Sequence, residues 1–189
     1  MAASMANKGH IVACDTSKRR LEGATRRLRR AGVFNVEQRV LTSERDPWVK
    51  RHRARFDRVL VDAPCTGTGT WRRNPDAKWT LKPSDLDELV ALQRQILDSA
   101  ARLVRPGGRL IYATCSLLSS ENEDQIAWFV EAHPEFTPIR VDQIWGRAIG
   151  APSMHDLYLR LSPARHGTDG FFVAVVERSA ADTSADKKT

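Results

Sequence analysis

Two thiols and two carboxylates stand where short apolar runs of this chain end. Asp15 and Asp62 each close such a run, and Cys65 follows Asp62 by three residues. Cys115 directly follows a third apolar run. A cysteine thiolate is a strong nucleophile, and a carboxylate accepts hydrogen bonds or a proton. These residue types are suited to covalent catalysis by a thiol with an acid close by.

The three cysteines differ in their surroundings. Cys14 lies inside its apolar run and fits the usual description of cysteine as a small buried side chain. Cys65 and Cys115 stand in the polar sequences Pro-Cys-Thr and Thr-Cys-Ser, which are typical of loops. An odd number of cysteines without a Cys-x-x-Cys pair argues against a disulfide framework and against a zinc or redox protein. A reducing cytoplasm fits this usage best.

Asp15 has two interpretations. In nucleotide-binding α/β domains, an acid at the end of an early strand accepts hydrogen bonds from ribose hydroxyls. The alternative is a solvated aspartate or one that caps the following helix. Gly67 and Gly69 do not form a dinucleotide fingerprint, because a third glycine and an opening helix are absent. We expect them to let the backbone pass close to a ligand.

Composition and charge narrow the class of protein. The 189 residues are 41% hydrophobic and 28% charged, as expected for one globular domain. No apolar stretch approaches the roughly 18 residues of a membrane-spanning helix, and the beginning of the chain lacks a signal-peptide pattern. The net charge is +7, and 23 of the 30 basic residues are Arg, which favours a nucleic-acid partner. Basic surfaces that are merely solvated would give the same charge.

The elements that must position the thiols and carboxylates alternate between strands and helices. The patterns predict strands over residues 10–15, 36–41, 58–62 and 109–114. They predict helices over residues 17–31, 84–104 and 120–132, and a loop or short surface helix over residues 42–55. Residues 157–161 and 171–176 read as an antiparallel hairpin. An α/β domain with a mostly parallel sheet follows, with its ligand site beyond the carboxyl ends of the strands.

Several blocks of the sequence resemble one family. Residues 62–76, Asp-Ala-Pro-Cys-Thr-Gly-Thr-Gly-Thr-Trp-Arg-Arg-Asn-Pro-Asp, resemble the fourth motif of the Sun-type RNA cytosine-5 methyltransferases, which include bacterial 16S rRNA methyltransferase B. The other blocks that are similar to this family, in the same order, are Gln93–Leu97, Arg105–Gly108, Tyr112–Ser116, Glu121–Glu123 and His166–Phe172. The resemblance covers about residues 8–178.

The resemblance implies a Rossmann-like class I methyltransferase sheet that lacks its first strand and ends in the antiparallel hairpin. Residues 1–178 would be the catalytic domain, S-adenosylmethionine its cofactor, and residues 179–189 a disordered tail. The implied partner is RNA, with ribosomal RNA ahead of tRNA, and neither a membrane nor a metal is implied.

The resemblance also implies a role for each site residue. Cys115 would add to carbon 6 of cytosine, and Cys65 would assist resolution of the covalent adduct. The reverse assignment stays open, because DNA cytosine-5 methyltransferases use a Pro-Cys thiol. Asp62 would lie between cofactor and base, with Pro64 beside the cofactor, and Asp15 would hold the cofactor ribose.

RNA contacts are expected next to this site. The target base must leave its stack to reach the pocket. We expect contacts with the RNA from Arg72, Arg73 and Lys78, and from His166 in the closing motif.

The sequence departs from the family pattern in two places. The glycine-rich cofactor loop is absent, and residues 1–6 read like the end of the helix that follows it, so we expect the C-terminal part of a longer protein. The acid expected after the third family strand is replaced by a segment in which Glu44 or Asp46 would serve only if the loop shifts. These departures support an alternative, a fragment that binds RNA without activity.

Overall fold

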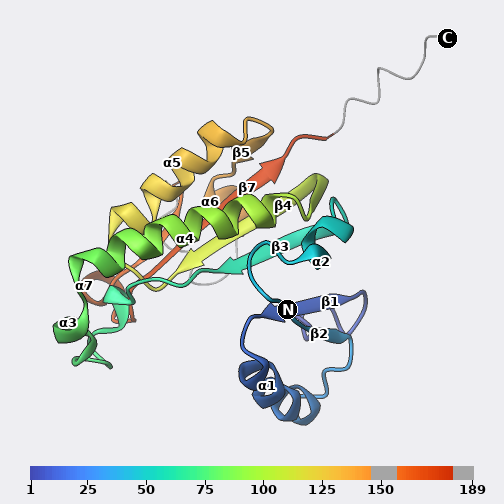
Figure 1. Ribbon diagram of the computed structural model, residues 1–189, viewed down its shortest axis with the longest axis horizontal. Helices are drawn as coiled ribbons and strands as arrows, with labels where there is room; N and C mark the ends of the chain where they lie inside the picture. Colours follow the sequence, from blue (N-terminus) through green and yellow to red (C-terminus); the bar gives the residue numbers. More distant parts are fainter. Residues whose placement is uncertain (146–156, 181–189) are drawn as a thin grey trace. The chain divides into compact units, whose positions relative to one another are not determined.

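Residues 1–145 and 157–180 are described in the computed structural model of the chain (Figure 1). Contacts divide the chain into two units, Met1–Trp48 and Val49–Thr189. Each unit is built from strands and helices that alternate along the sequence, which confirms the α/β class.

The first unit is a two-stranded sheet with one long helix. Strands β1 (Ile11–Asp15) and β2 (Val36–Val40) pair in parallel, and α1 (Lys18–Arg30) connects them. The Ser17 side chain accepts a hydrogen bond from the backbone of the first turn of α1. Gly32, with φ of +65°, follows its last turn, as a glycine stop predicts. The predicted strand–helix–strand unit is confirmed.

The second unit contains a five-stranded mixed sheet. Its strands are β3 (Phe56–Asp62), β4 (Val104–Thr114), β5 (Phe136–Pro138), β6 (Leu159–Leu161) and β7 (Phe171–Arg178). The order is β3-β4-β7-β5, and β6 also pairs with β7. Strands β3 and β4 are parallel, whereas β7 runs antiparallel to all of its neighbours. The predicted hairpin of β6 and β7 is therefore confirmed.

Helices connect and cover this sheet. Their bounds are α2 (Pro47–Arg51), η1 (Thr68–Thr70), α3 (Ala77–Thr80), α4 (Pro83–Ala101), η2 (Ser119–Glu121), α5 (Glu123–Ala132), α6 (Val141–Trp145) and α7 (Pro163–His166). Helix α4 packs on β3 and β4, and α5 packs on α4 and β5 (Figure 1). The core between these layers is apolar and includes Leu97, Val104, Leu110, Phe129, Phe136 and Phe172. Among the helices of the described residues, none has both the length and the apolar character needed to span a membrane.

The boundary between α4 and β4 differs from the prediction. Helix α4 ends at Ala101 instead of continuing to residue 104, because Val104 is fully buried at the start of β4. The Leu103 carbonyl accepts hydrogen bonds from two backbone N–H groups at the start of β3. The Pro-Gly-Gly sequence after Arg105 lies in an irregularity of the β3–β4 ladder and does not precede the strand. Of the predicted tail, residues 181–189 lie outside the described residues.

Candidate active site

The structure brings two of the three thiols together. Cys115 directly follows the last residue of β4, and Cys65 follows β3 by three residues. Asp62 is paired with Ala113 in the parallel ladder, so β3 and β4 end at the same edge of the sheet. The Sγ atoms of Cys65 and Cys115 are 3.4 Å apart, and both side chains are half-buried. The predicted convergence of these two cysteines is therefore observed in the geometry.

The environment of Cys65 keeps this residue protonated. Burial is the main cause that raises the pKa of the Cys65 thiol, and the hydrogen bond and the charge repulsion from Cys115 add to it. Cys65 is therefore a neutral thiol at physiological pH, within hydrogen-bond distance of the second sulfur, and either sulfur can be the donor.

Two buried polar residues fix the segment that carries Cys65. Glu121 is fully buried, and its carboxylate accepts hydrogen bonds from the backbone N–H of Thr66 at 2.8 Å and from the Thr66 hydroxyl. The Gln93 amide donates to the same carboxylate at 3.0 Å and to the Pro64 carbonyl at 2.9 Å. The residues before and after Cys65 are thereby tied to α4 and to η2.

A second network fixes the segment that carries Cys115. The Thr114 hydroxyl donates to Asn122 at 2.6 Å, and the Asn122 amide donates to the Ser116 carbonyl at 3.0 Å. The Ser116 N–H donates to the Thr114 hydroxyl at 3.2 Å. All three polar side chains are buried, so the position of the Cys115 sulfur is well determined.

The glycines of the Cys65 loop allow close contact with the rest of the site. The Gly69 N–H donates to the Cys115 carbonyl at 2.9 Å, and the Gly170 N–H donates to the Gly69 carbonyl at 2.8 Å. A Cβ at Gly69 would lie 2.5 Å from the Gly170 carbonyl oxygen. The backbone thus passes close to another segment of the protein, whereas the sequence suggested close passage to a ligand. Gly67 has a φ of +68°, and a Cβ at this position would lie 3.9 Å from the Cys115 sulfur.

The predicted carboxylates differ in their partners. Asp62 is exposed at the end of β3, and its carboxylate has no partner among the described residues. Asp15 accepts a hydrogen bond from the Ser17 N–H at 2.7 Å through Oδ1, and its Oδ2 lies 3.7 Å from an Arg20 nitrogen. Oδ1 of Asp15 therefore caps the start of the helix, as one of the two interpretations predicts. Among the described residues, Oδ2 has only the Arg20 guanidinium, at 3.7 Å, as a partner.

Asp46 is occupied within its own loop. Its carboxylate accepts hydrogen bonds from the N–H and hydroxyl of Thr42 at 2.8 and 2.9 Å, and from the Trp48 N–H at 2.8 Å. These hydrogen bonds lower the pKa of Asp46 to about 2. Asp46 therefore stabilises the loop in its present conformation, and the expectation that it would serve only after a shift of the loop stays a prediction. Glu44 lies 3.4 Å from Nε of Arg45.

Cys14 is placed in β1 as predicted, but it is exposed. Side chains alternate between the two faces of a strand. Helix α1 covers one face of the two-stranded sheet, and Cys14 is the exposed residue of β1, so it is not a core side chain.

The expected RNA-contacting arginines share one internal carboxylate. Arg72 lies 3.7 Å from Asp169, and Arg73 also forms an ion pair with this residue. Asp169 is nearly buried, whereas both guanidinium side chains are more than half exposed. This pairing could not be predicted from the sequence, because Asp169 lies almost one hundred positions further along the chain.

Lys78 and His166 lie on different short helices. The Lys78 ammonium stands 5.3 Å from the ring centroid of Trp79 on α3. His166 ends α7, and its Nδ1 accepts a hydrogen bond from the Ser162 N–H at 3.1 Å. Both side chains are exposed and available to a ligand.

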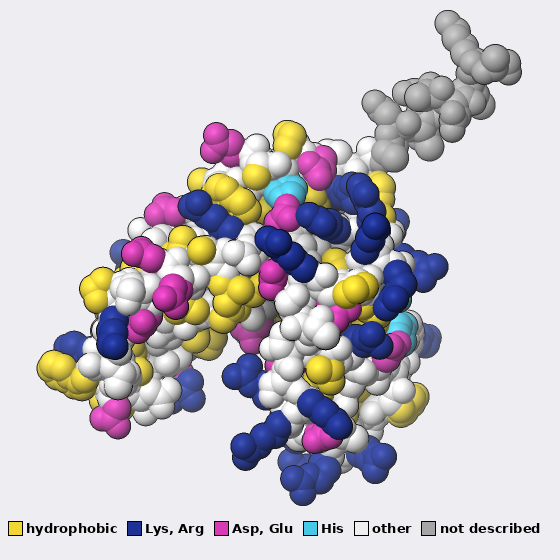
Figure 2. Space-filling model, in the orientation of Figure 1, with side chains coloured by type: hydrophobic (Ala, Val, Ile, Leu, Met, Phe, Trp, Pro, Cys, Tyr) yellow, Lys and Arg dark blue, Asp and Glu magenta, His cyan; other side chains and the backbone are white. Residues whose placement is uncertain are grey.

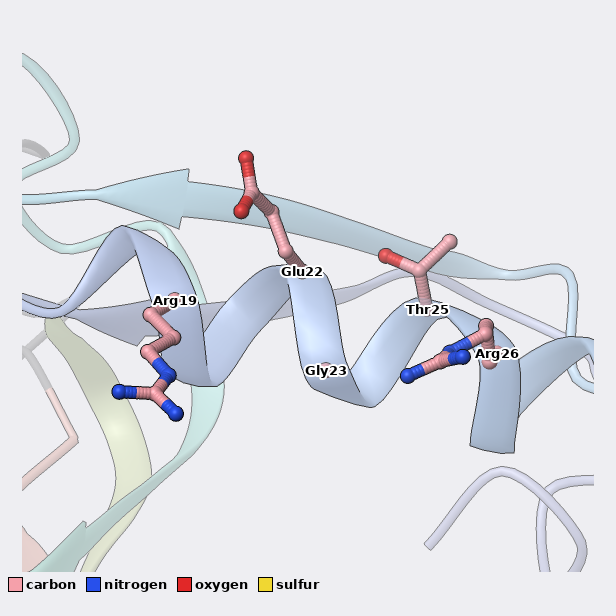
Figure 3. Close-up of a pocket in the computed structure, with 5 residues that line it drawn as sticks. All are labelled: Arg19, Glu22, Gly23, Thr25 and Arg26. Carbon is pink, nitrogen blue, oxygen red and sulfur yellow. The ribbon is translucent and has the colours of Figure 1, made fainter.

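The described surface includes a smaller and a larger hollow. One of about 160 Å³ adjoins the Cys115 segment and is lined by Ser116, Leu117 and Phe171, among others. The larger, of about 580 Å³, lies on α1, where Arg19 and Arg26 stand on either side of Gly23 (Figure 3). It contains no predicted site residue. Within residues 1–145 and 157–180, no group of three His, Cys, Asp or Glu side chains is arranged to hold a metal ion.

Comparison with known proteins identifies the family of this chain. Residues 1–177 match the family described as 16S rRNA methyltransferase RsmB/F. The chain belongs to this family. The resemblance that the sequence motifs indicated is therefore confirmed.

Curated relatives of this family are similar over most of the chain. The ribosomal RNA small subunit methyltransferase B of Shewanella oneidensis is 38% identical over 164 residues, which are 87% of this chain and 36% of that protein. The probable ribosomal RNA small subunit methyltransferase B of Bacillus subtilis is 34% identical over 179 residues, 94% of this chain and 40% of that protein. The chain thus spans less than half the length of these relatives.

Solved structures show the same fold. NSun6 from Pyrococcus horikoshii, determined with SFG, has a TM-score of 0.78 and is 28% identical, covering 94% of this chain and 43% of that one. A methyltransferase homolog protein from Pyrococcus horikoshii has a TM-score of 0.73 and is 30% identical, covering 94% of this chain and 56% of that one. The class I methyltransferase-like fold predicted from the motifs is confirmed.

Proposed function

We propose that this chain carries the catalytic site of an S-adenosylmethionine-dependent RNA methyltransferase that forms 5-methylcytosine. The observation that carries the proposal is the 3.4 Å separation of the Cys65 and Cys115 sulfurs beyond the ends of β3 and β4. Membership of the RsmB/F family supports ribosomal RNA as substrate, with tRNA as the second possibility, and the cytoplasm as the location.

The chemistry explains why a thiol is needed. Carbon 5 of cytosine is a poor nucleophile until a group adds at carbon 6. The Cys115 thiolate forms a bond to carbon 6, and the electrons of the carbon 5–carbon 6 double bond become available at carbon 5. Bound S-adenosylmethionine supplies the electrophilic methyl group that carbon 5 attacks. After a base removes the carbon 5 proton, the double bond reforms and the carbon 6–sulfur bond breaks.

Cys65 is suited to the last step. It is held protonated beside the second sulfur, so it can donate a hydrogen bond to the Cys115 thiolate as this thiolate leaves carbon 6. A stabilised leaving group speeds adduct resolution. This assignment makes Cys115 the nucleophile and Cys65 the residue that releases the product.

The carboxylates fit the polar groups of the cofactor. A carboxylate with an unfilled acceptor position matches the hydroxyl and ammonium donors of S-adenosylmethionine. Asp15 offers Oδ2, so we assign it to the ribose hydroxyls. Asp62 has no partner among the described residues, and we assign it, with Pro64, to the boundary between cofactor and base.

The RNA backbone is assigned to exposed basic side chains. Arg72, Arg73, Lys78 and His166 are exposed, and Arg72 and Arg73 precede α3 on the segment that continues from the Cys65 loop. Cationic side chains at this position can hold the phosphates on either side of an unstacked cytosine.

Methyl transfer to unmodified small-subunit ribosomal RNA, followed by nucleoside mass spectrometry, tests the proposal. Wild-type protein and a Cys14→Ala control are expected to form 5-methylcytosine. Cys115→Ala is expected to abolish it, and Cys65→Ala to accumulate a protein–RNA adduct that resists denaturation. An adduct with Cys115→Ala instead would reverse the two roles. RNA binding without methylation or cofactor binding by the wild type would favour the inactive RNA-binding alternative.

A further inference from the structure

A large aromatic side chain projects from the segment that follows the Cys65 loop. Trp79, on α3, is 81% exposed. Tryptophan is usually well buried, because its ring contributes a large apolar area to packing. Burial within the described part of the chain does not explain this residue, whose exposed ring can contact a ligand.

We propose that Trp79 stacks on an unpaired RNA base next to the target cytosine. The proposal rests on the proposed RNA methyltransferase function and names the contact that holds the flanking nucleotide. Stacking on an aromatic ring is the usual way in which proteins hold single-stranded bases, and it tolerates any base because every base has a π-face.

The position of α3 supports this contact. The Cys65 loop is bonded to the Cys115 carbonyl through Gly69, and consecutive turns lead from Thr70 to α3. Figure 1 shows α3 at the end of the sheet toward which β3 and β4 point. Trp79 therefore lies on the continuation of the loop that carries one of the two active-site thiols.

The charge around the ring also favours a nucleotide. The Lys78 ammonium is 5.3 Å from the ring centroid and has no carboxylate partner among the described residues. Arg72 and Arg73 precede it on the same segment, although Asp169 neutralises part of their charge. Figure 2 shows hydrophobic surface over α3 with Lys or Arg side chains directly against it. An aromatic face beside a cation can accept a base and its phosphate together.

Trp79 stands alone among the exposed large hydrophobic side chains of its part of the sequence. In the segment between Leu60 and Leu117, every residue of which the structure describes, Trp79 is the only such side chain. Interfaces between proteins present contiguous apolar patches, whereas a single ring matches the size of one base.

The test is RNA binding by fluorescence anisotropy, with a fluorescein-labelled single-stranded RNA and a fully paired duplex of the same sequence as probes. Trp79→Ala is expected to raise the Kd for the single strand roughly 5- to 100-fold, and Trp79→Phe to retain most of the affinity. Phe34→Ala is the matched control, because Phe34 is 82% exposed and no cation of the described residues lies over its ring. The Kd for the duplex should be the same for Trp79→Ala and for Phe34→Ala, since paired bases offer no free face on which the ring could stack.

Each outcome has a distinct meaning. A selective loss of single-strand affinity in Trp79→Ala, with an unchanged melting temperature, supports stacking. Equal single-strand affinities for Trp79→Ala and Phe34→Ala overturn it, even if methylation proceeds. An equal loss on the single strand and the duplex also overturns it. A wild-type protein that binds neither RNA overturns both this inference and the proposed function, whereas selective binding without methylation overturns the proposed function alone.

Discussion

Replacing Glu121 by Gln is expected to destabilise the protein and slow catalysis. The Glu121 carboxylate is fully buried and accepts three hydrogen bonds, two from Thr66 and one from Gln93. Glutamine has the same shape but no charge, and its amide nitrogen cannot accept a hydrogen bond. If the nitrogen takes the Oε1 position, the Thr66 N–H and the Gln93 amide lose their acceptor, and if it takes the Oε2 position, the Thr66 hydroxyl must turn to accept. A buried donor left unsatisfied costs about 1–3 kcal/mol, so the expected loss in the free energy of unfolding is about 1–3 kcal/mol.

Denaturant titration measures this loss directly. The denaturant concentration at the midpoint should fall. The slope of the unfolding free energy against denaturant concentration should stay constant, because the surface exposed on unfolding is unchanged. Glu123→Gln is the matched control, since Glu123 is a neighbouring carboxylate whose partner is the exposed Arg160. An exposed ion pair contributes about 1 kcal/mol at most, so the control should be nearly neutral.

Catalysis provides the second readout. The Thr66 and Pro64 contacts hold the segment that carries Cys65, so Glu121→Gln should lower kcat. The Kd for RNA should not change, because the buried carboxylate cannot touch the substrate. If Glu121→Gln and Glu123→Gln have equal unfolding free energies and equal kcat, the reasoning about this network is wrong.

Three further predictions concern other contacts of the two units. Gly69→Ala should destabilise the protein by about 2 kcal/mol or more and reduce methylation, because the new Cβ would meet the Gly170 carbonyl oxygen at 2.5 Å; a denaturation midpoint equal to wild type would refute this. The lowered pKa of Asp46 means that its stabilisation is present above the ordinary pKa near 3.9 and is lost as the pH falls through about 2. Unfolding followed by circular dichroism should therefore show that stability falls less between about pH 4 and 2 for Asp46→Asn than for wild type. Identical dependence of stability on pH in the two proteins would contradict this role of Asp46. Diamide should oxidise Cys65 and Cys115 to an intramolecular disulfide that peptide mapping detects and dithiothreitol reverses, and failure to form it would contradict the 3.4 Å separation.

The sequence predicts the elements that position the site because their signals are local. Short β-branched runs that end in Asp62 and Thr114, each followed by loop-forming residues, are sufficient to place two thiols at strand ends. The parallel register of β3 and β4 then brings these ends together.

The supporting contacts could not be predicted because they join distant parts of the chain. Gln93 and Glu121 meet only after α4 and η2 pack together, and Asp169 reaches Arg73 only when the loop before β7 folds against η1. The one available signal was a glutamine on the otherwise apolar face of α4. At Val104 the helical spacing of apolar residues continues, but the residue is buried as the first residue of β4, so burial in the sheet outweighs the local pattern.

Mapping the site of covalent attachment tests the central claim most directly. The adduct that Cys65→Ala forms with RNA can be digested with nuclease and protease, and its peptides sequenced by mass spectrometry. The proposed mechanism predicts a cytidine remnant on the peptide that contains Cys115. A remnant on any other residue, or no adduct with an RNA that the wild-type protein methylates, would contradict it.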